Sequence, residues 1–163
     1  PYYNLAGGGD VRDHRLRVAA ARCTPMDAGL IPTGELAPVE AVGCDFRRAR
    51  TLRDADPAAN GFDVNLALDA PRGRAPAAEV WAAGLRLRLW TDRPGLQLYD
   101  GRGLDGVTGG HEGAVFRRFG GLCLEAQDFP DSPNRPEFPS ILHGPDRPYS
   151  QSLTVEIAPD PTA

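Results

Sequence analysis

The sequence contains no lysine, because all 18 of its basic residues are arginines. This absence excludes chemistry that needs a lysine amine from this chain, such as a Schiff base, a lysine-bound pyridoxal phosphate or a lysine general base. The sequence also has no apolar run of the roughly 18 residues that a membrane-spanning helix needs, so no membrane segment is expected. The formal net charge is −4 and the arginines are scattered, which excludes the basic patch of a nucleic-acid-binding protein.

Disulfide and metal-ligand patterns are absent as well. The three cysteines are Cys23, Cys44 and Cys123. They form no C-x-x-C pair and no zinc spacing, so we expect reduced thiols, as in a cytoplasmic protein, and no metal site. The three histidines are His14, His111 and His143. They stand in polar or Gly- and Pro-rich surroundings without ligand spacing, so we expect them at the surface.

Glycine and proline are abundant, with 19 and 16 residues, which predicts many short elements joined by turns. Hydrophobic residues at 41% and charged residues at 25% are typical of a soluble globular protein. We expect one structural unit over residues 1–157 and a disordered tail over 158–163. The sequence opens in mid-pattern at Pro1 without a methionine, so we expect a piece of a longer protein.

Apolar and polar residues alternate along much of the chain. In 85–90 a leucine occupies every second position, and arginines or a tryptophan fill the others. Similar alternation occurs in 15–20, 62–68, 96–99, 122–127 and 153–157, and turn-rich stretches at 6–10, 54–61, 70–78 and 104–113 lie between the alternating segments. A period of two is typical of strands with one buried face, so the sequence predicts an all-β fold, an antiparallel β-sandwich or a piece of one. No long helix is expected, because Pro38 interrupts the best candidate at 35–42.

Exposure to solvent accounts for most polar residues on the outer faces of these strands, but three pairs are candidates for a sugar-binding or catalytic site. The pairs are Asp63 with Asn65, Gln97 with Tyr99, and Glu125 with Gln127. Carboxylates and carboxamides bind sugar hydroxyls through hydrogen bonds, and an aromatic ring supplies an apolar floor. Gly61, beside the first pair, lacks a side chain and lets another group approach the backbone. Glu125 is the strongest candidate for a general base, because residues 120–124 before it are small or apolar.

Five segments make this pattern specific, and they occur in one order along the chain. They are PYYNLAG (1–7), TPMDAGLIPTGE (24–35), NGFDVN (60–65), TDRPGLQLY (91–99) and GLCLEAQDFPDSPN (121–134). Together they closely resemble the aldose 1-epimerase (galactose mutarotase) family, and residues 138–140 and Tyr149 continue the match. The resemblance covers essentially the whole chain and corresponds to about the C-terminal half of the family.

The resemblance implies a large antiparallel β-sandwich, often called a supersandwich, of which this chain is a partial copy with a sugar cleft on one sheet. It also implies an isomerase that interconverts the α and β anomers of hexoses such as galactose and glucose. The family uses no metal and no organic cofactor, and its partner is a monosaccharide substrate.

The resemblance also assigns residues, motif by motif. Glu125 of L-E-x-Q-x-x-P-D matches the family's catalytic base. Asp63 of G-F-D-x-N and Gln97 of P-G-x-Q match residues that bind the substrate. Tyr99 shares the face of Gln97 and is either an aromatic wall of the sugar site or a packing residue. The family's acid histidine would fall just before Pro1, so the resemblance implies little turnover by this chain alone.

Two other functions stay open at this stage. A hexose-6-phosphate 1-epimerase of the same superfamily would show arginines converging on a phosphate. A non-catalytic carbohydrate-binding protein would keep the cleft without changing the rate of anomerisation. A glycosidase is disfavoured, because it needs a second carboxyl about 5–9.5 Å from Glu125, and only Asp131 and Asp63 are plausible partners.

Overall fold

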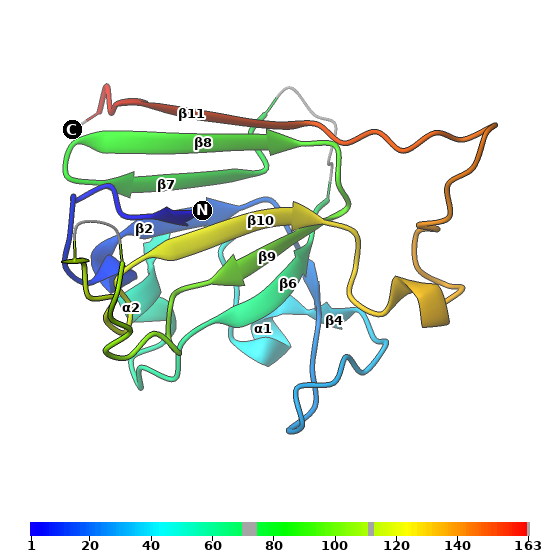
Figure 1. The fold of residues 1–163 in the computed structure, drawn as a ribbon, viewed down its shortest axis with the longest axis horizontal. Helices are drawn as coiled ribbons and strands as arrows, with labels where there is room; N and C mark the ends of the chain where they lie inside the picture. Colours follow the sequence, from blue (N-terminus) through cyan, green and yellow to red (C-terminus); the bar gives the residue numbers. More distant parts are fainter. Residues whose placement is uncertain (70–74, 111–112, 163) are drawn as a thin grey trace.

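The computed structural model describes residues 1–69, 75–110 and 113–162, and it has two β-sheets that enclose a shared core (Figure 1). The six-stranded sheet has the order β1 (Tyr2–Tyr3), β10 (Leu122–Gln127), β9 (Gly95–Tyr99), β6 (Asp63–Ala67), β3 (Arg22–Thr24) and β4 (Ala37–Pro38). The five-stranded sheet has the order β11 (Leu153–Pro159), β8 (Leu85–Thr91), β7 (Ala78–Ala82), β2 (Arg15–Val18) and β5 (Arg50–Thr51). Every strand pair in these ranges is antiparallel, which confirms the predicted fold class.

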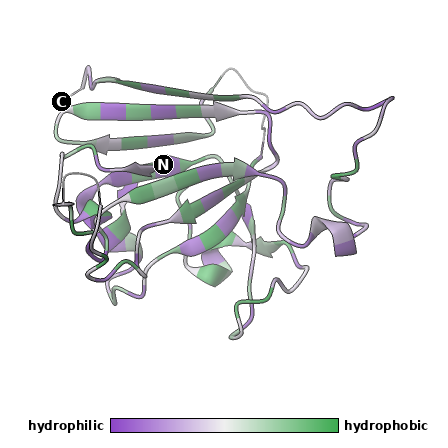
Figure 2. Cartoon of the chain, in the orientation of Figure 1, coloured by the Kyte–Doolittle hydropathy of each residue, from purple (hydrophilic) through white to green (hydrophobic). Residues whose placement is uncertain are grey.

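The core lies between the sheets and is built from the apolar positions of the alternating segments. On β8, Leu87 and Leu89 are 0% exposed, while Arg86 and Arg88 point away from the core. The alternation is visible along β8 in Figure 2. The facing strands contribute Leu66, Leu96, Leu98, Leu122 and Leu124. Each buried leucine stabilises the fold by about 1.5–3 kcal/mol relative to an exposed one, so this pattern fixes which face of each strand points outward.

The helices are single turns. They are α1 (Val39–Val42), α2 (Leu52–Ala55) and the 3-10 turns η1 (Val11–Asp13) and η3 (Ser132–Asn134). Pro38, predicted to interrupt a helix, instead precedes the first residue of α1, where its φ of −58° suits a helix start. Gly43 ends α1 in the left-handed region at φ 76°. Within the described residues no helix is long and apolar enough to cross a membrane.

The C-terminal end is more ordered than expected. β11 continues to Pro159, and the Asp160 N–H donates to the Gly84 carbonyl at 2.8 Å. The disordered tail expected over 158–163 is therefore wrong for 158–160, because backbone pairing with β8 and its turn extends beyond the alternating residues. The predicted turns at 70–78 and 104–113 lie partly outside the described residues.

The surface position expected for the histidines is wrong for His14. This side chain is 2% exposed, and its Nε2 accepts a hydrogen bond from the Leu5 N–H at 3.0 Å. Burial lowers the pKa of His14, so the neutral ring is favoured and serves as a structural acceptor. His143 is exposed as expected, and His111 lies outside the described residues.

Candidate functional site

The three polar pairs predicted from the sequence lie on one face of the six-stranded sheet. In the ladder between β10 and β9, Glu125 lies opposite Gln97. In the ladder between β9 and β6, Gln97 lies opposite Asn65. The same ladder sets Tyr99 opposite Asp63. Opposite residues on neighbouring strands share a face, and the leucines between them fill the core, so this polar face is the outer one.

A chain of side-chain hydrogen bonds crosses this face. Gln97 Nε2 donates to Asp63 Oδ1 at 2.8 Å. Gln127 Nε2 donates to Gln97 Oε1 at 3.4 Å and to Asn65 Oδ1 at 3.3 Å. Asn65, which is 2% exposed, donates through Nδ2 to Thr24 Oγ1 at 3.1 Å. Because both ends of the Gln97 amide have partners, its orientation is fixed, and Asp63 is held beside it.

Glu125 stands on β10 as an exposed carboxylate. The small and apolar residues that precede it, 121–124, are buried, so the carboxylate projects from an apolar base into the open face. Burial raises the pKa of Cys123 to about 11, and the negative charge of Glu125 contributes to that rise. Among the described residues Glu125 forms no ion pair, and its nearest opposite neighbour is the Gln97 amide rather than a cation.

Tyr99 borders the polar face and is only partly buried. Its hydroxyl accepts a hydrogen bond from the Gly103 N–H at 2.9 Å. Its ring meets the ring of Tyr2 edge-on, with 6.4 Å between centroids. Burial is the main cause that raises the pKa of Tyr2, and the negative charge of Glu125 adds to it. The two rings therefore form an apolar border beside Glu125, and Tyr99 serves both packing and the edge of the face.

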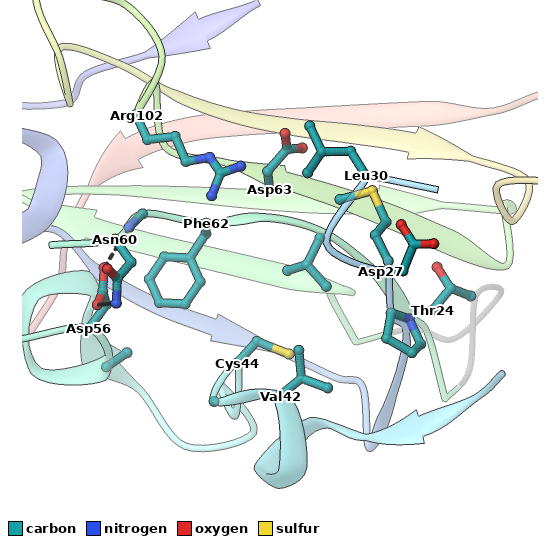
Figure 3. A pocket seen from close by; sticks show the side chains of 16 residues that line it. Thr24, Asp27, Leu30, Val42, Cys44, Asp56, Asn60, Phe62, Asp63 and Arg102 are labelled. Atoms are coloured by element: carbon teal, nitrogen blue, oxygen red, sulfur yellow. Dashed lines mark hydrogen bonds between the residues drawn. The ribbon is translucent and has the colours of Figure 1, made fainter. Parts of the chain in front are cut away.

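A cleft of about 380 Å³ opens next to this face, and Asp63 belongs to both (Figure 3). Its walls come from loop 24–30, the end of α1, loop 55–62 and Arg102. The polar side chains labelled in Figure 3 include Thr24, Asp27, Asp56, Asn60, Asp63 and Arg102. Neither Gln97 nor Glu125 lines the cleft. The predicted site residues thus form an open face, and the recess begins at one end of it.

Arg102 reaches the cleft across Gly61. Gly61 has a φ of 83°, and a Cβ atom there would lie 2.4 Å from the Arg102 Cβ. The close approach predicted at Gly61 is confirmed, and the approaching group is the Arg102 stem. The Asp100 side chain is 1% exposed, and its Oδ1 accepts a hydrogen bond from the Arg102 backbone N–H at 3.2 Å. Burial raises the pKa of Asp100. Asp100 and Gly61 together fix where the Arg102 side chain leaves the backbone.

Sequence reasoning missed Arg102, Asp56 and Asn60, which lie in loops without periodicity. The one available signal was Gly61, whose lack of a side chain makes room for Arg102. No group of three or more His, Cys, Asp or Glu side chains able to hold a metal ion occurs within 1–69, 75–110 and 113–162.

Comparison with known proteins gives a consistent result. The sequence model of the aldose 1-epimerase family matches residues 1–156. A galactose mutarotase from Mus musculus is 41% identical over 163 residues, which is 96% of this chain and 48% of the relative. An aldose 1-epimerase from Escherichia coli (strain K12) is 37% identical over 148 residues, covering 85% of this chain and 42% of the relative.

Solved structures support the same fold. A GalM/aldose epimerase homologue from C. elegans has a TM-score of 0.81 at 23% identity, covering 97% of this chain and 49% of that chain. A galactose 1-epimerase from Lactobacillus acidophilus has a TM-score of 0.62 at 23% identity, covering 97% and 47%. The chain spans about half the length of the relatives that it matches. Since the family model covers nearly all of its residues, the chain belongs to the aldose 1-epimerase family.

Proposed function

We propose that this chain carries the sugar-binding face and the catalytic base of a mutarotase that interconverts the α and β anomers of hexoses such as galactose and glucose. The observation that supports this most is the outer face of β10, β9 and β6. There Glu125 lies opposite Gln97, and Gln97 donates to Asp63 at 2.8 Å. A carboxylate beside a fixed amide and a second carboxylate suits the binding of adjacent sugar hydroxyls.

In the proposed mechanism, the Glu125 carboxylate takes the proton from the hydroxyl on C1 of the sugar. An acid protonates the ring oxygen as the C1–O5 bond breaks, and the ring opens to the aldehyde. Rotation about the C1–C2 bond then exposes either face of the aldehyde, and the reverse proton transfers close the ring. Asp63 and Gln97 hold the hydroxyls so that C1 stays beside Glu125.

The acid that protonates the ring oxygen is proposed to come from outside this chain. His14 is buried and bonded to Leu5, and His143 packs against Tyr149, with 5.0 Å between ring centroids. Neither ring belongs to the face of Glu125. This chain alone should therefore bind sugar and catalyse mutarotation weakly, while the full-length protein should have both groups.

A glutamine at position 125 tests the proposal in the full-length protein. Glu125→Gln keeps the size of the side chain but cannot accept the proton, so the mutarotation rate should fall by about 10²–10⁴-fold, as for the loss of a general base. Polarimetry of freshly dissolved α-galactose measures the rate, and calorimetry measures galactose binding. Glu156→Gln, on the other sheet, is the matched control and should retain the rate within about twofold.

Unchanged polarimetric decay in Glu125→Gln would contradict the catalytic assignment. Retained binding without any catalysis by the wild-type protein would indicate a carbohydrate-binding protein instead. A hexose-6-phosphate 1-epimerase would prefer the phosphorylated sugar in the same assay. The cleft beside Asp63 disfavours that outcome, because it carries three carboxylates, Asp27, Asp56 and Asp63, against one guanidinium.

We further propose that the protein works in a reducing compartment such as the cytoplasm, with a monosaccharide as its partner. The support is that its three cysteines are free and buried.

A further inference from the structure

The neighbouring Gly61 and Asp100 restrict where the Arg102 side chain can lie at the cleft. The stem of its side chain lies over Gly61, where a Cβ atom would meet the Arg102 Cδ at 2.9 Å. The backbone N–H of Arg102 donates a hydrogen bond to the buried Asp100 carboxylate. The guanidinium is thus directed into the cleft that Asp63 also lines (Figure 3).

Among the described residues, the guanidinium of Arg102 lacks the carboxylate partner that several other arginines of this chain have. Arg12, Arg47, Arg53 and Arg93 each contact one or more carboxylates. Within the described part of the chain, no hydrogen bond or ion pair reaches the Arg102 guanidinium, although the residue is half-buried. A half-buried fork of five N–H donors without protein acceptors is suited to oxygen atoms of a ligand.

The charge around Arg102 limits the class of that ligand. Asp27 Oδ1 accepts the N–H groups of Gly29 and Ile31, and Asp56 Oδ2 accepts the Gly61 N–H at 2.6 Å. These bonds hold the two carboxyl groups in place in the wall of the cleft. An anionic ligand would meet more negative than positive charge there, so a neutral ligand rich in hydroxyls fits better than a phosphate or a carboxylate.

The order of the strands sets how a sugar bound at Glu125 would lie across the sheet. Glu125 is on β10 and Asp63 is on β6, with β9 between them, so two strand spacings, about 10 Å, separate the two backbones. A pyranose ring that has C1 at Glu125 and lies across β9 would present its C4–C5 edge to Asp63 and the cleft. The hydroxymethyl group, which is carried on C5, would project from that edge.

We propose that Arg102 is a specificity-determining residue that donates hydrogen bonds to the hydroxymethyl oxygen of a neutral hexose, whose far end enters the cleft. This inference rests on the proposed function, because that function places C1 at Glu125. It adds a residue and a substrate feature: the sugar is recognised by its 6-hydroxyl and is not phosphorylated there.

Arg102→Met tests the role, because methionine keeps a flexible stem over Gly61 and removes the donors. In the full-length protein, KM for galactose should rise about tenfold, as expected for losing a charge-assisted hydrogen bond, with kcat within about twofold. KM for 6-deoxygalactose, which lacks the hydroxyl, should change less than about twofold. Arg102→Lys should restore part of the loss. Arg86→Met is the matched control, since Arg86 is half-buried on β8 of the other sheet, lies outside the cleft and should leave both sugars unaffected.

Two results would overturn the proposal: an equal rise in KM for both sugars, which marks a structural role, or no rise for galactose. Calorimetric Kd values for the two sugars give the same comparison without turnover. If Glu125→Gln leaves the rate unchanged while Arg102→Met still weakens galactose selectively, the proposed catalysis fails and the Arg102 contact stands. If Glu125→Gln abolishes the rate and Arg102→Met has no effect, the proposed catalysis stands and the Arg102 contact fails.

Discussion

The outer faces of the two sheets use their polar residues in opposite ways. Across the five-stranded sheet, Arg17, Glu79, Arg88 and Glu156 lie in one row through the strand register. Arg17 pairs with Glu79 at 3.1 Å, and Arg88 pairs with Glu156. On the six-stranded sheet, Glu125 has no cation opposite it, and a fixed Gln97 amide lies there instead.

The comparison separates structural polarity from candidate functional polarity. Alternating charges in a row satisfy one another and leave nothing for a ligand, and the guanidiniums of Arg15 and Arg88 also lie over the rings of Trp81 and Trp90. The carboxylate of Glu125 and the guanidinium of Arg102 lack such partners among the described residues. An unpaired charge beside a polar face or a cleft is therefore a better guide to a site than charge itself.

Replacing Gln127 should weaken sugar binding on the six-stranded sheet without unfolding the protein. Gln127→Leu deletes the donor to Gln97 and Asn65, so Gln97 loses a positioning contact. We expect KM for galactose to rise about 3- to 10-fold, equivalent to roughly 1 kcal/mol, with kcat within about twofold and an unchanged pH profile. Gln127→Glu, which cannot donate when ionised, should not rescue the loss.

Gln151→Leu is the control for that experiment, because Gln151 donates to the Ala126 carbonyl from an exposed loop. A galactose KM that stays at the wild-type value in Gln127→Leu would show that the amide network does not position the sugar-binding groups.

Breaking the charged row on the five-stranded face should have a smaller and different effect. Arg88→Met removes the partner of Glu156, so the free energy of unfolding should fall by less than about 1 kcal/mol. The loss should shrink in 1 M salt, where the Debye length is about 3 Å. Urea unfolding at two salt concentrations measures it. A change in mutarotation beyond twofold would contradict the separation of the two faces.

The fold was largely predictable from the alternation of apolar and polar residues, because burial on one face dictates it. The segments at 85–90, 122–127 and 153–157 all form strands. β7 was missed because its sequence, AEVWA, has two alanines and only weak alternation. The order of strands in each sheet depends on packing between distant segments, and local patterns do not contain it.

The candidate site was partly predictable for the same reason. Alternation placed Asp63, Gln97 and Glu125 on outer strand faces, and the ladders bring those faces together. The roles assigned to the three residues stay predictions. Arg102 could not be predicted from the sequence, because its placement depends on tertiary contacts with Gly61 and Asp100. The burial of His14 could not be predicted for a similar reason, since its role as an acceptor depends on the Leu5 N–H, nine residues away.

A crystal structure of the full-length protein with galactose tests the central claim most directly. The account predicts the sugar on the β10–β9–β6 face, with a Glu125 carboxylate oxygen about 2.6–3.2 Å from the C1 hydroxyl oxygen. Galactose bound elsewhere, or bound on this face with C1 turned away from Glu125, would contradict it.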